Sequence, residues 1–138
     1  MALKVFSEEW IKAYKDAINK SAYRDAGKDW RAGPVSLVVL ANPDIGLSQD
    51  VGIWLDLHEG VCREASVCDR QKASTAPFCI TGEYSQWKQV LLNELDPIKG
   101  MMQGKLKLKG DLPTIVRYVK AAQELVNAAS TLETEFLD

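Results

Sequence analysis

The most restrictive feature of this sequence is how little metal-binding and phosphate-binding chemistry it contains. It has one histidine, and its three cysteines, Cys62, Cys68 and Cys79, form neither a CxxC pair nor any other short pair. Metal centres usually draw on several such ligands at fixed spacing. The glycine-rich phosphate motifs GxGxxG and GxxxxGK(S/T) are missing as well. The sequence therefore predicts no bound metal and no cofactor.

Residues for acid–base or nucleophilic catalysis are equally scarce. An enzyme of that kind needs a positioned base, and the one histidine, His58, stands beside Glu59 where a hairpin turn is expected. A surface turn residue is the simpler interpretation of His58. A thiol hydrolase built on His58 and Cys62 is an alternative hypothesis, although their spacing does not ensure that the two side chains share a face. We expect a non-catalytic protein.

Long apolar runs and a strong charge imbalance are also missing. The longest apolar run, residues 37–41, is far too short to cross a bilayer, and Glu8 and Glu9 interrupt the first residues before an apolar leader could form. The net charge of -2, without a basic stripe interleaved with aromatics, argues against nucleic acid as a partner. Residues 135–138 are not a Ser-Lys-Leu-type address, and an odd number of cysteines fits reduced thiols. We expect a cytoplasmic protein with at most transient membrane contact.

The composition that is present is ordinary for a globular protein. Hydrophobic residues make up 46% of the 138 positions and charged residues 26%. A chain of this length can bury a core without metal or disulfide support. We therefore expect one domain over residues 1–138.

The first half of the chain predicts one helix and three strands. Phe6, Trp10, Tyr14 and Ile18 recur every four residues, which predicts an amphipathic helix over residues 7–25 with Ser7 as its N-cap. Three strands are expected after it, at residues 35–41, 51–57 and 61–68. A tight turn at residues 58–60 would join the last two strands into a hairpin. We expect the third strand at a sheet edge and Trp54 on the more polar face of the second.

The second half of the chain predicts shorter elements in close succession. A fourth strand ends at Gly82, and Ser85 is expected to cap the helix that follows. Asp96-Pro97 ends that helix and begins another turn. A fifth strand at residues 105–109 would send its three lysines to one face and its two leucines to the other. The last helix is expected to bury Leu112, Ile115, Val116, Val119, Ala122 and Val126.

These elements together predict an α+β fold, with helices gathered against one side of a mainly antiparallel sheet. A group of apolar side chains from the predicted helical pair is expected to point toward the leucines of the fifth strand: Trp87, Leu91, Leu95, Ile98, Met101 and Met102 toward Leu106 and Leu108. An ordinary packed core explains this pattern. A lined cavity for an aliphatic ligand explains it too, since methionine adapts to irregular space.

One stretch resembles a known family. Phe78-Cys79-Ile80-Thr81, the capped helix after it, Asp96-Pro97 and above all residues 101–110, which read MMQGKLKLKG, resemble the sterol carrier protein type 2 domain. That domain ends with an apolar pair, Gln-Gly-Lys and a short strand closed by glycine. The resemblance is clearest over residues 76–119, and residues 51–67 fit the preceding hairpin of the family more loosely.

The resemblance implies a five-stranded sheet covered by helices, with a hydrophobic tunnel between the two layers. Members bind sterols, fatty acids, fatty acyl-CoA or phospholipids without catalysis, which implies lipid binding and lipid transport, and Gln103 matches a family glutamine close to the tunnel. The expected ligand-binding residues are Phe78, Ile80, Trp87, Leu91, Leu95, Ile98, Met101, Met102, Gln103, Leu106, Leu108, Ile115 and Val119. An interaction or dimerisation module associated with a lipid-metabolising enzyme is the alternative, with Trp54 on its surface and a monomer or homodimer as its state.

Overall fold

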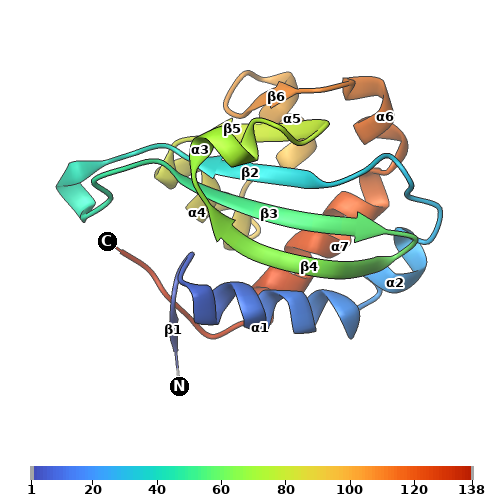
Figure 1. The fold of residues 1–138 in the computed structure, drawn as a ribbon, viewed down its shortest axis with the longest axis horizontal. Helices are drawn as coiled ribbons and strands as arrows, with labels where there is room; N and C mark the ends of the chain where they lie inside the picture. Colours follow the sequence, from blue (N-terminus) through green and yellow to red (C-terminus); the bar gives the residue numbers. More distant parts are fainter. Residues whose placement is uncertain (1, 138) are drawn as a thin grey trace.

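The computed structural model describes residues 2–137, in which helices flank a five-stranded sheet (Figure 1). The strands are β2 (Val35–Val39), β3 (Val51–His58), β4 (Val61–Cys68), β5 (Phe78–Gly82) and β6 (Lys107–Lys109). Their order across the sheet is β4-β3-β2-β5-β6, and the pair of β2 with β5 is parallel while the other neighbouring pairs are antiparallel. The predicted α+β fold with a mainly antiparallel sheet is confirmed, and so is β4 at an edge.

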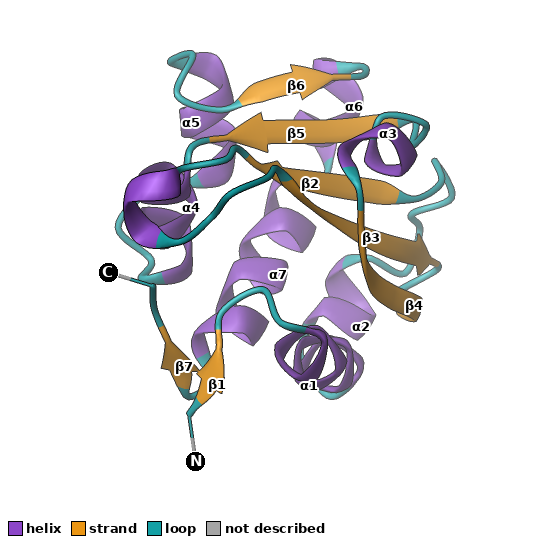
Figure 2. Cartoon of the chain, turned by 60° about the vertical axis from the view of Figure 1, so that its left-hand side comes forward, coloured by secondary structure: helices purple, strands orange, loops and turns teal. Residues whose placement is uncertain are grey.

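The helices lie on both faces of the sheet. They are α1 (Glu8–Asn19), α2 (Tyr23–Ala26), α3 (Arg70–Ala73), α4 (Tyr84–Leu91), α5 (Pro97–Met102), α6 (Leu112–Arg117) and α7 (Val119–Ser130), with a 3-10 turn at Pro43–Ile45. Figure 2 shows α1, α2 and α7 together on one side of the sheet and α3 on the other. The expectation that all helices share one side is therefore wrong for α3, whose Ala73 packs with Val38 and Cys79 on the far face.

The first helix is shorter than the sequence predicts. Ser7 caps it as expected, because its hydroxyl accepts a hydrogen bond from Trp10 N at 3.2 Å. The helix ends at Asn19 instead of continuing to residue 25, and the short α2 follows after a turn. Ser21 explains the break: its hydroxyl donates to Ile18 O at 2.8 Å and accepts from Tyr23 N at 3.1 Å. A serine hydroxyl that bonds in this way to backbone groups on both sides of it competes with the backbone hydrogen bonds of a continuous helix.

The hairpin of β3 and β4 forms where the sequence predicts it. Glu59 and Gly60 both have positive φ, at 50° and 82°, as two-residue hairpin turns of the primed type require. Gly60 also allows α2 to approach, since a Cβ at this position would clash with Arg24 O. Trp54 lies on the more polar face, half-buried, with the ammonium of Lys72 from α3 at 4.4 Å from its ring centroid.

The second half of the chain differs from expectation at one helix start. The N-cap of α4 is Glu83, without a side-chain hydrogen bond, so the prediction of Ser85 as cap is wrong. Asp96 caps α5 as predicted, with its carboxylate accepting from Ile98 N at 2.8 Å and Pro97 in the first turn. Strand β6 is confined to three residues, although Lys105, Lys107 and Lys109 are all exposed as expected.

The last predicted helix is two helices. It breaks at Tyr118, whose φ of -107° and ψ of 35° lie outside helical geometry, so α6 ends before it and α7 begins after it. The break rotates the apolar stripe from one helix to the next. Ile115 and Val126 are buried as predicted, whereas Val116 and Val119 are 44% and 49% exposed, which makes the prediction for these two valines wrong.

The two ends of the described chain pair with each other. Strands β1 (Leu3–Lys4) and β7 (Thr134–Glu135) form a small parallel sheet, with Leu3 opposite Thr134. The indole N–H of Trp10 in α1 donates to the Thr134 hydroxyl at 3.0 Å, which fastens the first helix to this pair. None of the described helices is long and apolar enough to span a membrane.

Candidate functional site

The alternation of β2 and β3 produces one continuous apolar face. In their register, Leu37 lies opposite Ile53 and Val35 opposite Leu55, and directly opposed residues point to the same side. Leu37 also pairs with Ile80 of β5, which extends this face across the parallel pair. The intervening Ser36 and Val38 point to the far face. The sheet therefore presents a row of aliphatic side chains toward α1, α2 and α7.

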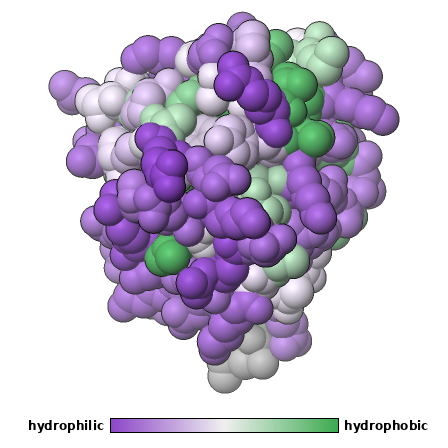
Figure 3. All heavy atoms as spheres, turned by 90° about the vertical axis from the view of Figure 1, so that its right-hand side faces the viewer, coloured by the Kyte–Doolittle hydropathy of each residue, from purple (hydrophilic) through white to green (hydrophobic). Residues whose placement is uncertain are grey.

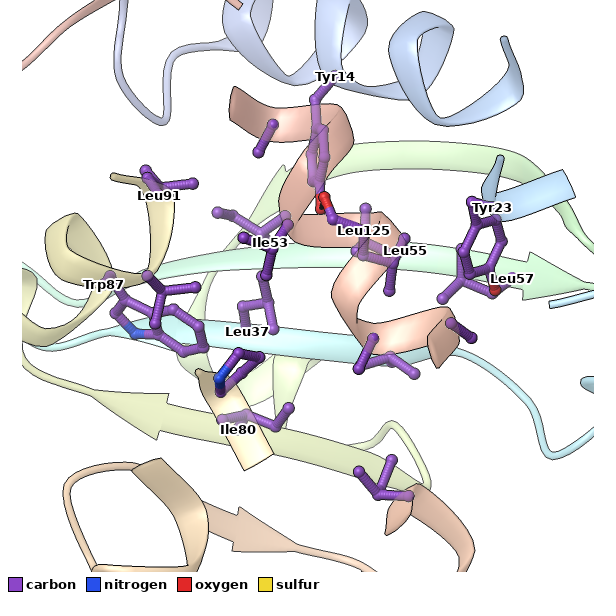
Figure 4. A pocket seen from close by; sticks show the side chains of 18 of the residues that line it. Tyr14, Tyr23, Leu37, Ile53, Leu55, Leu57, Ile80, Trp87, Leu91 and Leu125 are labelled. Atoms are coloured by element: carbon purple, nitrogen blue, oxygen red, sulfur yellow. Dashed lines mark hydrogen bonds between the residues drawn. The ribbon is translucent and has the colours of Figure 1, made fainter. Parts of the chain in front are cut away.

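A cavity of about 110 Å³ lies between this apolar face and the helices. Figure 4 shows side chains from the sheet, α1, α2, α4 and α7 pointing into it. Its lining is aliphatic and aromatic throughout, and among residues 2–137 no charged side chain lines it. The lining residues are Phe6, Trp10, Tyr14, Tyr23, Trp30, Val35, Leu37, Val39, Ile53, Leu55, Leu57, Ile80, Trp87, Val90, Leu91, Pro97, Met101, Ile115, Tyr118, Ala121, Ala122, Leu125, Val126 and Ala129.

Three aromatic side chains of the lining direct their polar atoms to the protein backbone. Trp87 donates its indole N–H to Val38 O at 2.9 Å, and Trp30 donates to Gly33 O at 2.9 Å. The hydroxyl of Tyr14 donates to Leu125 O at 2.9 Å. Because these groups are satisfied within the protein, the faces of their rings are left to line the cavity.

Gly82, at the end of β5, makes room for two neighbours beside the cavity. A Cβ there would lie 2.5 Å from Leu106 Cδ2 and 3.2 Å from the indole nitrogen of Trp87. Leu106 is 1% exposed and packs between Gly82 and Gly100. It is therefore part of the core beside Trp87 and does not line the cavity. The glycine thus permits the close packing that holds Trp87 against β2.

Burial shifts the titration of the acidic groups near the cavity. Loss of solvent raises the pKa of the Tyr14 hydroxyl well above its usual value, with Cys62 as a smaller contribution. Desolvation also raises the pKa of the Cys62 thiol to about 11. A thiol with a raised pKa is a poorer nucleophile than an ordinary cysteine at neutral pH.

The structure does not assemble the thiol dyad considered from the sequence. Cys62 lies opposite Leu57 in the β3–β4 ladder and is fully buried, so it shares the cavity-facing side of the sheet. His58 follows Leu57 and points to the other side, where its Nε2 is 3.5 Å from Glu59 Oε1. The hypothesis that His58 and Cys62 act together is therefore wrong. Within residues 2–137, no group of three or more His, Cys, Asp or Glu residues is placed to hold a metal ion.

Five of the ligand-binding residues predicted from the sequence line the cavity: Ile80, Trp87, Leu91, Met101 and Ile115. Four others are buried beside it, namely Phe78, Leu95, Ile98 and Leu106, while Leu108 is half-buried. Met102, Gln103 and Val119 are exposed. Contact between Gln103 and a ligand stays a prediction, with its side chain on the surface after α5.

The sequence analysis missed the residues that α1, α2, β2, β3 and α7 contribute to the lining. Trp10 and Tyr14 belong to the predicted stripe of the first helix, and Leu55 belongs to the predicted apolar face of the second strand. Their apolar periodicity was visible. Periodicity does not tell which buried faces meet, because that depends on contacts between elements far apart in the sequence.

Comparison with known proteins agrees with this geometry. Residues 11–123 match the model of the SCP-2 sterol transfer family. A crystal structure of sterol carrier protein 2 superposes with a TM-score of 0.86 at 36% identity, covering 94% of this chain and 99% of that one. A conserved protein of Thermus thermophilus, described as possibly a sterol carrier protein, superposes with a TM-score of 0.87 at 34% identity. The match covers 97% of this chain and 93% of that one.

A more distant structure shares the fold. Palmitated SCP2L2 of Aedes aegypti superposes with a TM-score of 0.52 at 15% identity, covering 81% of this chain and 93% of that one. A sequence comparison with curated proteins finds no match.

Proposed function

Because the chain belongs to the SCP-2 sterol transfer family, we propose that it binds a lipid in the cavity between its sheet and its helices and carries it without catalysis. The observation that carries the proposal is the lining: an apolar space between the sheet and the helices, without a charged side chain among the described residues. Fatty acids, fatty acyl-CoA, sterols and phospholipids are the ligand classes that the family suggests. The palmitate on the Aedes aegypti protein supports an acyl chain as one of them.

The size of the cavity sets a condition on this function. Pockets for small molecules usually measure about 300 to 1,000 Å³, whereas this cavity measures about 110 Å³. A short hydrocarbon segment fits into that volume, since an engineered cavity of about 150 Å³ takes up benzene. A longer chain requires the half-buried side chains Leu91, Met101 and Leu125 to move. We propose that flexible side chains of this kind yield to the ligand.

The energy available from hydrocarbon burial is of the same order as the cost of association. About a dozen buried methylenes at roughly 0.8 kcal/mol each give on the order of 10 kcal/mol, against an association cost of about 4 to 15 kcal/mol. Binding therefore depends on a space that exists before the ligand arrives. The whole chain, residues 1–138, acts as one such domain in this proposal, and its unpaired cysteines fit a cytoplasmic location.

The alternative of an interaction module around Trp54 has less support. Its ring is half-buried and is covered by Lys72, so it does not form an open apolar surface. On the face drawn in Figure 3, hydrophilic side chains dominate and hydrophobic atoms gather near the upper edge. Whether the protein is a monomer or a homodimer stays a prediction.

Adjacent methionines provide a sharp test of lipid carriage. Met101 lines the cavity, whereas Met102, the next residue of α5, is 69% exposed. We expect Met101→Asp to reduce lipid uptake at least tenfold, because an unpaired carboxylate in an apolar site costs several kcal/mol. Met102→Asp should bind like the wild type. Native mass spectrometry of both variants after incubation with palmitate measures uptake, and circular dichroism verifies folding.

The outcomes separate the alternatives. Wild-type protein that takes up no lipid, whether copurifying or added, would remove the proposal. Equal loss of lipid uptake in Met101→Asp and Met102→Asp would show that the ligand contacts the outer face of α5 and not the cavity.

A further inference from the structure

Tyr23 differs from every other polar side chain around the cavity. It begins α2, is 1% exposed and lines the cavity. Figure 4 shows it beside Leu57, at the end of the cavity away from Trp87 and Leu91, with its hydroxyl directed toward the sheet. The cavity therefore has one end lined by hydrocarbon and indole and another that carries a phenol.

The hydroxyl of Tyr23 has no hydrogen-bond partner in the part of the chain that the structure describes, unlike the other tyrosines. Tyr14 donates to Leu125 O, and Tyr118 donates to Asp29 O at 3.2 Å. The oxygen of Tyr84 accepts from Leu137 N at 2.8 Å. Cys62, near enough to influence the titration of Tyr23, donates its thiol to Glu64 O at 3.4 Å instead. The oxygen of Tyr23 is not fully enclosed, because the enclosed side-chain oxygen without a partner among the described residues is Gln86 Oε1. A polar group that lines a cavity and makes no bond within the described chain is available to a ligand.

Packing alone does not account for this tyrosine. The tip of its ring lies over Gly27, directly after the same short helix, where a Cβ would come within 2.8 Å of the hydroxyl oxygen. The glycine thus makes space for an oxygen that bonds to nothing in the described chain. Phenylalanine would fill the same site without breaking a hydrogen bond of the described chain.

The surroundings of Tyr23 restrict what could bind to it. Burial raises the pKa of its hydroxyl well above the usual value, so it remains a neutral donor under physiological conditions. No cationic side chain lines the cavity among residues 2–137, so an ionised carboxylate placed here would lose its hydration without an opposite charge. An uncharged oxygen incurs a much smaller penalty and can accept the phenolic proton.

We propose that the Tyr23 hydroxyl is the hydrogen-bonding anchor for an uncharged oxygen, either a hydroxyl or a carbonyl, at one end of the lipid, whose hydrocarbon then extends toward Trp87. This inference rests on the proposed lipid carriage and adds an orientation and a ligand class to it. A long-chain alcohol, a sterol or an ester meets the requirement. A fatty acid in its ionised form does not meet it at this end of the cavity.

Three probes of equal chain length test the anchor. Dissociation constants of 1-dodecanol, dodecane and laurate are measured at pH 8 by displacement of a polarity-sensitive dye, for wild type, Y23F and Y84F. In Y23F, binding of dodecanol should weaken about two- to tenfold, the effect of one net hydrogen bond, while binding of dodecane is unchanged. Y84F removes a hydroxyl outside the cavity lining and should leave the ratio of the two constants as in the wild type. The loss for laurate should be smaller than that for dodecanol.

A second readout needs no ligand. Since Y23F breaks no hydrogen bond of the protein, its urea midpoint should not fall, whereas Y84F should lower it. Equal destabilisation by the two variants would assign the Tyr23 hydroxyl a structural bond and overturn the inference. Wild type that binds all three probes, with no selective loss of dodecanol in Y23F, would overturn the anchor alone. Wild type that binds none of the probes would remove lipid carriage itself.

Discussion

At the level of single residues, Ser36 shows how the far face of the sheet holds a helix. It lies in β2, is 0% exposed, and is the one buried polar or charged residue among those the structure describes, the tyrosines aside. Its hydroxyl donates to Ala73 O at 2.6 Å, which ties β2 to the end of α3. The apolar neighbours Val38 and Cys79 surround this contact, so no solvent replaces the bond when it is lost.

We predict that Ser36→Ala lowers the free energy of unfolding by about 1 kcal/mol, the net value of one buried hydrogen bond. Urea denaturation followed by circular dichroism measures the change. Ser48→Ala, in an exposed loop, is the control and should stay within about 0.5 kcal/mol of the wild type. Unchanged stability of Ser36→Ala would mean that α3 is held by its apolar contacts alone.

Single residues also show where sequence reasoning reaches its limit. The sequence indicates that Met101 and Met102 belong to an apolar turn, but consecutive helical residues point about 100° apart, so both cannot face the same space. Which of them turns inward depends on how α5 lies against its neighbours. The resemblance to the family placed Gln103 near the tunnel, and the end of α5 leaves its side chain on the surface.

At the level of elements, α7 is decisive for the cavity because it faces the sheet with small side chains. Ala121, Ala122 and Ala129 line the cavity together with Leu125 and Val126. Larger residues at the alanine positions would occupy the space opposite Leu37 and Ile53. The volume thus depends on small residues at particular positions of one helix.

Substitution of one alanine of α7 should close the cavity without unfolding the protein. We predict that Ala122→Leu lowers lipid uptake at least tenfold while the free energy of unfolding changes by less than about 2 kcal/mol, since the added methylenes enter existing space. A fluorescent fatty-acid titration and urea denaturation measure the two effects. The same change at the exposed Ala32 should leave uptake intact. Full uptake by Ala122→Leu would place the ligand elsewhere.

The elements themselves follow closely from local pattern. Periodicity in the sequence predicts β3, its hairpin with β4 and the start of α5, because turn residues and caps act over a few positions. Breaks within helices are harder to predict. The interruptions at Ser21 and Tyr118 fall inside apolar stripes that continue on both sides, and each depends on a local bond or a tertiary contact, such as the hydroxyl of Tyr118 on Asp29 O.

At the level of the whole molecule, the buried acidic groups make stability depend on pH in the alkaline range. Burial raises the pKa of Tyr14, Tyr23 and Cys62 in the folded protein, and the pKa of Cys62 reaches about 11 against an ordinary 9.0. A group whose pKa is raised by folding contributes stability that is complete below its unfolded pKa and is lost as the pH rises above it. Ionisation therefore favours the unfolded chain.

We predict that the urea midpoint is steady up to about pH 9 and falls above it, first as unfolded Cys62 ionises and then, from about pH 10, as the unfolded tyrosines do. Absorbance at 295 nm should show that Tyr14 and Tyr23 ionise only together with unfolding. If all four tyrosines titrate at ordinary values while circular dichroism reports an intact fold, these two hydroxyls are open to solvent and the cavity lining is misassigned.

The order of the elements along the chain has a consequence for biosynthesis. Every strand of the five-stranded sheet precedes α7, so a ribosome completes the aliphatic face of Leu37, Ile53 and Leu55 before the helix that faces it exists. During that interval the nascent polypeptide exposes an apolar surface, which chaperones can bind and which can lead to aggregation. The face that we propose to hold a lipid in the finished protein would need protection from solvent during translation.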